Sequence, residues 1–309
     1  MQRKIISRFS TMDNHDALTS AALLILAALT LIPGCGKKDH ITDPVVSFAD
    51  VPLSKSIVPG QLDEASGIAD SKANSGYLWV EQDGGNPNDI TLLSYAGTVF
   101  KKINIKAAFN RDWEDLAVAN GPIAGKSYVY LADIGDNNSA FSDYIIYRFA
   151  EPTAGTDTVS VFDEIRFQYP DGSHDAEAIL VDNSTNDIYI ITKRDAVSRI
   201  YKLSYPQNVT AINTTVYVAS LPFNGVVSAA SSATGEEVLV KTYASLYYWQ
   251  RSANENITQV LVKSPLQISF QPEPQGEAIC FKNDNSGYYT LSERPSQVAF
   301  VNLNFYIRK

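Results

Sequence analysis

One short motif occurs five times in the chain, and each copy carries an oxygen atom that can bind a cation. The motif is an oxygen-bearing residue, a spacer and, in most copies, an aliphatic residue. Its copies begin at Ser66, Glu114, Glu177, Ser228 and Glu277. From one copy to the next the intervals are 48, 63, 51 and 49 residues, and regular spacing of this length is typical of repeat architectures. We therefore expect the five side chains to meet at one point.

Three of these side chains are carboxylates, whose mutual repulsion must be compensated. At about 5 Å in an effective dielectric of about 20, each pair repels by about 3 kcal/mol. The total of about 10 kcal/mol is as large as the ~5–15 kcal/mol net stability of a domain. Carboxylate and hydroxyl oxygens suit Ca²⁺ rather than zinc. The sequence therefore predicts a calcium site at the point where the five side chains meet. Its predicted ligands are Glu64, Ser66, Glu114, Glu177, Ser228 and Glu277.

Charged residues on the strands that follow the motif offer an alternative to a metal. These residues are Glu81, Asp133, Lys193, Lys241 and Glu293, which we expect at about the same level of the fold. A closed network of ion pairs with the two lysines would neutralise the glutamates without a cation. If calcium instead orients a phosphate or lactone oxygen, the same five residues are our candidates for acid-base catalysis and substrate binding.

The sequence around each motif copy predicts several short strands. A turn rich in Asn, Asp or Gly follows each copy, as hairpin connections require. Second strands are expected at 77–80, 128–131, 188–191, 238–240 and 288–291. Third strands are expected at 90–95, 144–148, 199–203, 246–249 and 298–301, and fourth strands at 99–103, 162–169, 215–220 and 257–262.

Five four-stranded repeats of about 50 residues predict an all-β, five-bladed β-propeller over residues 46–309. The first strand of each blade lines the central channel of a propeller, so the five motif side chains would face one another. The last repeat lacks chain for a fourth strand, whereas residues 46–57 look like a strand without a repeat. We therefore expect the N-terminal strand to complete the last blade. A sixth blade within the longest interval is an alternative.

Residues 1–35 are typical of a bacterial lipoprotein signal peptide. Three basic residues precede an apolar run of 16 residues at 17–32, shorter than the ~20 residues that span a bilayer. The run ends in Leu31-Ile-Pro-Gly-Cys35, which resembles a lipobox and implies that Cys35 is lipidated. An uncleaved membrane helix is the alternative. Residues 36–45 are polar and are expected to form a tether.

Charge and cysteine content limit the partners. The net charge is −9, and residues 1–35 carry three basic and two acidic side chains, so the remainder carries −10. Such a chain repels nucleic acid and bare anionic lipid. Cys280 then has no cysteine partner and lies in a hydrophobic segment, where a buried, inert thiol is expected. We expect a monomer, anchored by lipid to the outer membrane or the cell surface, that binds a small molecule or protein at the channel mouth.

Several segments resemble propeller families. Residues 112–117, 133–138, 147–152, 174–179 and 275–279 resemble a widespread group of uncharacterised bacterial secreted propellers. The segment Glu64–Ala69 is similar to the start of the SdiA-regulated and esterase-like phytase propeller domains. The ring order Ser, Glu, Glu, Ser, Glu resembles the calcium-activated nucleotidases (apyrases), five-bladed propellers with calcium on the axis. This resemblance implies the same ligand positions here, but local motifs for the nucleotidases' basic phosphate-binding residues are missing.

Two functions are compatible with these features. In the first, the protein is a lipid-anchored binding or scaffolding propeller of the cell envelope, and the axial calcium is structural. In the alternative, it is a calcium-dependent hydrolase of phosphate esters or lactones. The motif predicts the architecture and the metal directly, whereas catalysis depends on residues at the channel mouth whose geometry the sequence does not reveal.

Overall fold

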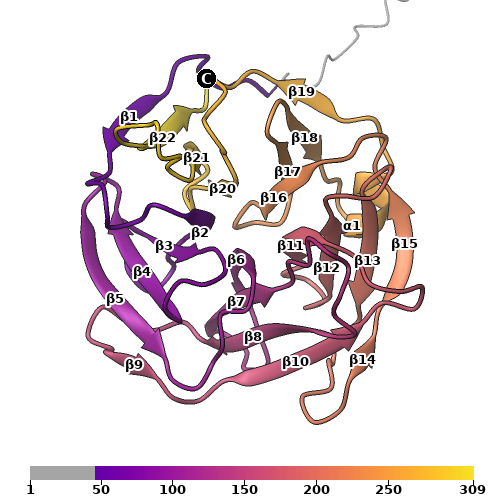
Figure 1. Cartoon of the computed structure of the whole chain (residues 1–309). Coiled ribbons are helices and arrows are strands. Elements are labelled where there is room, and N and C mark those ends of the chain that lie inside the picture. Colours follow the sequence, from indigo (N-terminus) through magenta and orange to yellow (C-terminus); the bar gives the residue numbers. More distant parts are fainter. Residues whose placement is uncertain (1–45) are drawn as a thin grey trace, which may run out of the picture. The chain divides into compact units, whose positions relative to one another are not determined.

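Five small β-sheets are arranged around a central axis in the computed structural model, which describes residues 46–309 (Figure 1). This arrangement is a five-bladed β-propeller and confirms the predicted fold. The described residues contain no sixth sheet, because the longest interval between motif copies is used for a loop to a neighbouring blade. The predicted signal peptide, Cys35 and the 36–45 tether lie outside the described residues.

The strands of each blade follow one another from the axis outward. The first blade contains β2 (Ala65–Asp70), β3 (Tyr77–Gln82), β4 (Asp89–Ser94) and β5 (Val99–Ile105). The second contains β6 (Trp113–Asn120), β7 (Ser127–Asp133), β8 (Tyr144–Ala150) and β10 (Asp163–Gln168). The third contains β11 (Ala176–Val181), β12 (Ile188–Thr192), β13 (Arg199–Leu203) and β15 (Val216–Ser220). The fourth contains β16 (Val226–Ser231), β17 (Glu237–Thr242), β18 (Leu246–Gln250) and β19 (Leu266–Ile268).

The fifth blade joins the two ends of the described chain. It contains β20 (Ala278–Phe281), β21 (Gly287–Leu291), β22 (Asn302–Ile307) and, as its outermost strand, β1 (Leu53–Ser56). The antiparallel register pairs Leu53 with Phe305, and the Ser54 hydroxyl donates a hydrogen bond of 2.6 Å to Asn304 Oδ1. The N-terminal segment therefore closes the ring, as predicted.

Two very short strands connect neighbouring blades at their outer edges. Strand β9 (Thr158–Val159) follows β8 of the second blade in sequence but pairs in parallel with β5 of the first. Strand β14 (Asn213–Thr214) follows β13 of the third blade but pairs with β10 of the second. These strands cover edges that would otherwise be open for pairing with other chains. Two-residue strands have no sequence periodicity, and the sequence analysis did not predict them.

Two predicted strands are corrected by the structure. Residues 257–262 form helix α1 (Ile257–Leu261) instead of a fourth strand, because Asn256 and Gln259 make a reciprocal capping box. The helix buries Ile257, Val260 and Leu261, one face at helical spacing, and β19 takes the edge of the fourth blade. In the fifth blade the third strand is β22 rather than residues 298–301. Within residues 46–309 no helix has the length and hydrophobicity that crossing a membrane requires.

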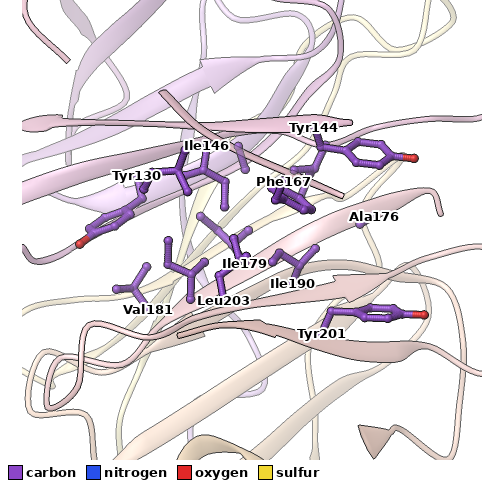
Figure 2. Packing of buried hydrophobic residues seen from close by; sticks show 14 of the residues in the cluster. Tyr130, Tyr144, Ile146, Phe167, Ala176, Ile179, Val181, Ile190, Tyr201 and Leu203 are labelled. Atoms are coloured by element: carbon purple, nitrogen blue, oxygen red, sulfur yellow. The ribbon is translucent and has the colours of Figure 1, made fainter. Parts of the chain in front are cut away.

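The core consists of five hydrophobic clusters, each between two neighbouring blades. Figure 2 shows the cluster in which Tyr130 and Ile146 of the second blade pack toward Ile179 and Ile190 of the third. Because every sheet packs on both faces, the inner strands are buried along their length. Cys280 is buried in the cluster between the fifth and first blades, as its hydrophobic neighbours predict.

Candidate metal centre

Bulges at the start of the inner strands determine where the motif side chains lie. In β11 the pairing passes from Ala176–Thr192 to Ala178–Ile191, which leaves Glu177 as the extra residue. Ser66 in β2 and Glu114 in β6 are the extra residues of equivalent bulges. Glu277 immediately precedes β20 at the corresponding position, since Ala278 pairs with Leu291 as Ala178 pairs with Ile191. Four of the five motif residues are therefore equivalent, and all four are buried.

Ser228 does not occupy the expected position. The extra residue of β16 is Val227, because Val226 pairs with Thr242 and Ser228 pairs with Lys241. Ser228 therefore lies one residue deeper in the channel, and its hydroxyl donates to Asp115 Oδ1 at 3.3 Å. Ser228 was assigned to the motif by its spacing alone. It lies one residue away from the expected position because of the bulge at Val227, which has no signal in the sequence.

On one side of the mouth a lysine lies between two of the motif glutamates and pairs with both. The Lys193 ammonium forms a short ion pair with Glu177 and lies 3.7 Å from Glu277 Oε1. The Tyr243 hydroxyl is 3.1 Å from Lys193 Nζ and donates to Glu277. Ser66 Oγ lies 3.3 Å from Glu277 Oε2 and 3.5 Å from Glu114 Oε2. On this side the geometry follows the ion-pair alternative.

On the other side, carboxylates gather with less compensation. Asp83, Asp112 and Glu114 form one group that could hold a metal ion, and Glu114, Asp175 and Glu177 form another. Within each group one oxygen per residue lies within 4.8 Å of the others. Calcium binds its oxygen ligands at about 2.3–2.6 Å, so such a group matches the span of one coordination shell. The candidate metal centre is therefore displaced toward the first three blades.

Sequence analysis missed three of these carboxylates. Asp112 and Asp175 each precede a motif glutamate by two residues, and residues two apart on a strand share a face. The Asp-x-Glu pattern at 112–114 and 175–177 was thus an available signal. Asp83 follows β3 and carries no motif. It reaches the site only because the first blade packs beside the second.

Glu64, predicted as an additional ligand, lies apart from both groups. Its side chain is exposed, and Oε2 accepts a hydrogen bond of 2.6 Å from the Asn86 amide. Glu64 precedes β2 by one residue, as Asp112 precedes β6 and Asp175 precedes β11, but its carboxylate is bonded to Asn86 and belongs to neither group.

The five residues predicted for catalysis lie at different levels. Glu81 pairs with Gly67 and Lys241 with Ser228, and both side chains are fully buried below the mouth. Within residues 46–309 neither carboxylate oxygen of Glu81 has a hydrogen-bond partner. The Lys241 ammonium donates to the carbonyl of Gly276. The prediction of a common level is therefore wrong for Glu81 and Lys241.

The other three lie nearer the mouth. Asp133 Oδ1 accepts a hydrogen bond of 2.8 Å from the Asp112 backbone and lies 3.9 Å from Arg111 Nε. Glu293 Oε2 accepts one of 2.8 Å from the Gln275 amide. The third residue, Lys193, forms the ion pairs with Glu177 and Glu277 that are given above. Asp83 and Tyr243 occupy the positions in their blades that Lys193 and Glu293 occupy in theirs. Each of the four lies two residues after a second-strand residue, and that residue pairs with the inner-strand residue that follows the bulge position.

Burial and mutual repulsion raise the carboxyl pKa values of the centre. Burial, and then the charge of Glu177, raise the pKa of Glu114 well above its ordinary value. Burial raises the pKa of Glu177 to about 8, although Lys193 opposes the shift. Burial also raises the pKa of Asp83 to about 6 and, together with Glu277, that of Glu293 to about 9. Without a bound cation, the cluster therefore retains protons that isolated carboxyl groups would lose.

Asp115 lies in the channel below the candidate centre. Its Oδ1 accepts the backbone N–H of Leu116 at 2.9 Å, and its Oδ2 accepts that of Ile179 at 2.9 Å. With the Ser228 hydroxyl, these bonds join three blades through one fully buried carboxyl group. Beyond it, along the inner strands, lies a cavity of about 50 Å³ lined mainly by alanine and aliphatic side chains. Asp115 therefore lies between the candidate centre and this cavity.

Comparisons with known proteins add little to this description. No protein-family model matches the chain, and no curated protein matches it significantly. A luciferin-regenerating enzyme is 10% identical with a TM-score of 0.49, covering 84% of this chain and 95% of its own. The PQQ-bound aldose sugar dehydrogenase of Streptomyces coelicolor is 9% identical with a TM-score of 0.48, covering 85% and 100%. U3-55K is 10% identical with a TM-score of 0.40, covering 77% and 79%.

These values leave the propeller assignment resting on the five sheets themselves. Similarities with TM-scores below 0.5 carry no argument about the chemistry of this chain, and fold alone does not specify function. The families that the sequence segments resemble are not supported by a sequence match. Function must therefore be argued from the residues at the channel mouth.

The metal-free protein should lose stability as the pH rises. A carboxyl group whose pKa is raised by folding binds more protons in the folded state, so the free energy of unfolding falls between its ordinary and its folded pKa. For Asp83, Glu177 and Glu293 this window runs from about 4 to about 6, 8 and 9. In excess chelator we expect a melting temperature at least about 2–4 °C lower at pH 8 than at pH 5. Glu177→Gln should reduce the difference, and a melting temperature that rises with pH would contradict the assignment.

Proposed function

We propose that the channel mouth binds a hard divalent cation, Ca²⁺ above all, and that the protein is a calcium-dependent binding module of the bacterial cell envelope. The observation that carries the proposal is the pair of carboxylate groups that meet at Glu114. Their ligands are oxygen atoms only, which favours calcium over zinc. Burial and the repulsion between acids raise the pKa values of Glu114 and Glu177, and a bound cation would oppose both effects.

In this proposal the cation also has a structural role, because its ligands come from different blades. Asp83, Glu114 and Glu177 come from the first, second and third blades, so a cation in either group would tie two neighbouring blades together at the mouth. On the far side, Lys193 and Tyr243 already serve Glu277, and a cation beside Glu277 would be repelled. Coordination positions that the carboxylates leave open would face the mouth, where an oxygen atom of a small molecule or a protein can bind.

Calcium should stabilise the protein through this centre. A ligand that binds only the folded state at a hundred times its Kd adds about 2.7 kcal/mol, or about 5–10 °C in melting temperature for a domain of this size. We expect chelation to lower the melting temperature by this amount and calcium to restore it. Glu114→Gln should abolish the calcium response, whereas Glu236→Gln, at an exposed acid outside both groups, should retain it. An identical melting curve in chelator and in calcium would reject the proposed function.

Membrane anchoring is proposed from the lipobox-like segment before Cys35. When the full chain is expressed in a bacterium, we expect it to incorporate labelled palmitate and to partition into the detergent phase. Cys35→Ser should abolish both, because no other residue offers a thiol at that site. Cys280→Ser is the matched control, since this thiol is buried. Palmitate incorporation that persists in Cys35→Ser would show that the anchor is elsewhere.

A second candidate function is calcium-dependent hydrolysis, and one specific arrangement favours it. Glu293, whose pKa is raised to about 9 by burial and Glu277, is protonated at neutral pH beside the candidate centre. It could donate its proton to the leaving oxygen when water attacks a phosphate ester or lactone that calcium polarises. Lys193 would then help to bind the developing negative charge.

Turnover of a substrate panel tests this candidate. The full chain is incubated with phosphomonoesters, nucleotides and lactones, each with calcium and with chelator. We expect calcium-dependent turnover that falls by about 10²-fold or more in Glu293→Gln, the usual size of an acid-catalysis effect. A panel without turnover at saturating calcium would eliminate the hydrolase and leave the binding role.

A further inference from the structure

The carboxylates of the mouth form two overlapping groups rather than one ring. Asp83 and Asp112 complete the first group with Glu114, and Asp175 and Glu177 complete the second. Oxygen ligands of a single calcium ion lie no more than about 5 Å apart, twice the metal–oxygen distance. The 4.8 Å span of each group therefore fits one ion. The five carboxylates together do not form a single group of that span.

Glu114 is placed to contribute to both groups. A Cβ atom at Gly135 would overlap with Glu114 Oε1 and with the carboxylate of Asp112, so these oxygens face the space that the missing side chain leaves. Glu114 Oε2 is turned toward Ser66 Oγ, at 3.5 Å. A glycine at 135 thus permits the close approach of Asp112 and Glu114. Glu114 also belongs to the group of Asp175 and Glu177, so it is the residue that can bridge the two groups.

A buried oxygen without a partner marks the second group independently of the clustering. Glu177 is only 3% exposed. Its Oε1 binds Lys193, whereas its Oε2 has no hydrogen-bond partner among the described residues. A buried carboxylate oxygen left unsatisfied is costly, and a cation between Glu114, Asp175 and Glu177 would satisfy it.

We infer that the mouth holds two divalent cations bridged by Glu114, one with Asp83 and Asp112 and one with Asp175 and Glu177. The inference rests on the proposed cation-binding function and specifies its stoichiometry. The two positions differ in access, because Asp83 and Asp112 are half-buried whereas Asp175 and Glu177 are buried. The inner cation is therefore shielded from solvent and supports the fold. The outer cation exchanges with solvent and faces the ligand.

Calcium stoichiometry tests the inference. The full chain, purified in detergent and freed of metal, is dialysed to equilibrium against labelled calcium over a range of concentrations. We expect two ions per chain. Asp83→Asn and Glu177→Gln should each lose one of the two, and Glu114→Gln should bind neither at the concentration that saturates the unmodified chain. Glu64→Gln, at an exposed acid beside the mouth, should still bind two.

Each outcome discriminates between the two proposals. One ion per chain would overturn the bridged pair and leave the single calcium centre, whereas no ion would reject the proposed function itself. Loss of all calcium in both Asp83→Asn and Glu177→Gln would also overturn two separate positions, provided that near-ultraviolet circular dichroism shows native packing. If a variant fails to fold, the stoichiometry of the unmodified chain still decides between one ion and two.

Discussion

Repulsion among carboxylates shapes the mouth of this propeller, because five inner strands begin at the same end of a narrow channel. Glu114, Glu177 and Glu277 are held there by backbone register and cannot turn away into solvent. The protein compensates this repulsion differently on the two sides of the axis. Lys193 and Tyr243 serve Glu177 and Glu277, whereas Glu114 faces further acids. The asymmetry between these sides is what makes a cation site plausible at Glu114 and unfavourable at Glu277.

The rest of the fold keeps these charges in place. Five clusters between the blades bury both faces of every sheet, and β1 joins β22 so that the ring has no free end. Asp115 ties three inner strands across the axis just below the acidic mouth. Burial of this carboxyl raises its pKa well above the ordinary value. Asp115 thus fixes the inner strands directly beneath the acidic residues of the mouth.

Much of the architecture could be predicted because it depends on local signals that recur. Turn residues and aromatic-aliphatic strands repeat about every 50 residues, and a surplus strand at residues 46–57 matched a deficit in the last repeat. Where local signals compete, prediction failed. Residues 257–262 are as apolar as a strand, but the capping box of Asn256 and Gln259 favours a helix. Strands β9 and β14 exist only because a neighbouring blade offers an edge.

For the candidate site, the sequence alone determined that oxygen-bearing residues recur at the start of every inner strand and converge on one axis. Their periodic spacing and the alternation of strand residues are sufficient for that. Only the tertiary structure decided which of them meet. A bulge at Val227 moves Ser228 away from the ring, and packing of the first three blades brings Asp83, Asp112 and Asp175 to Glu114 and Glu177. A one-residue register shift and contacts between distant segments leave no local trace, because both follow from how complete blades pack.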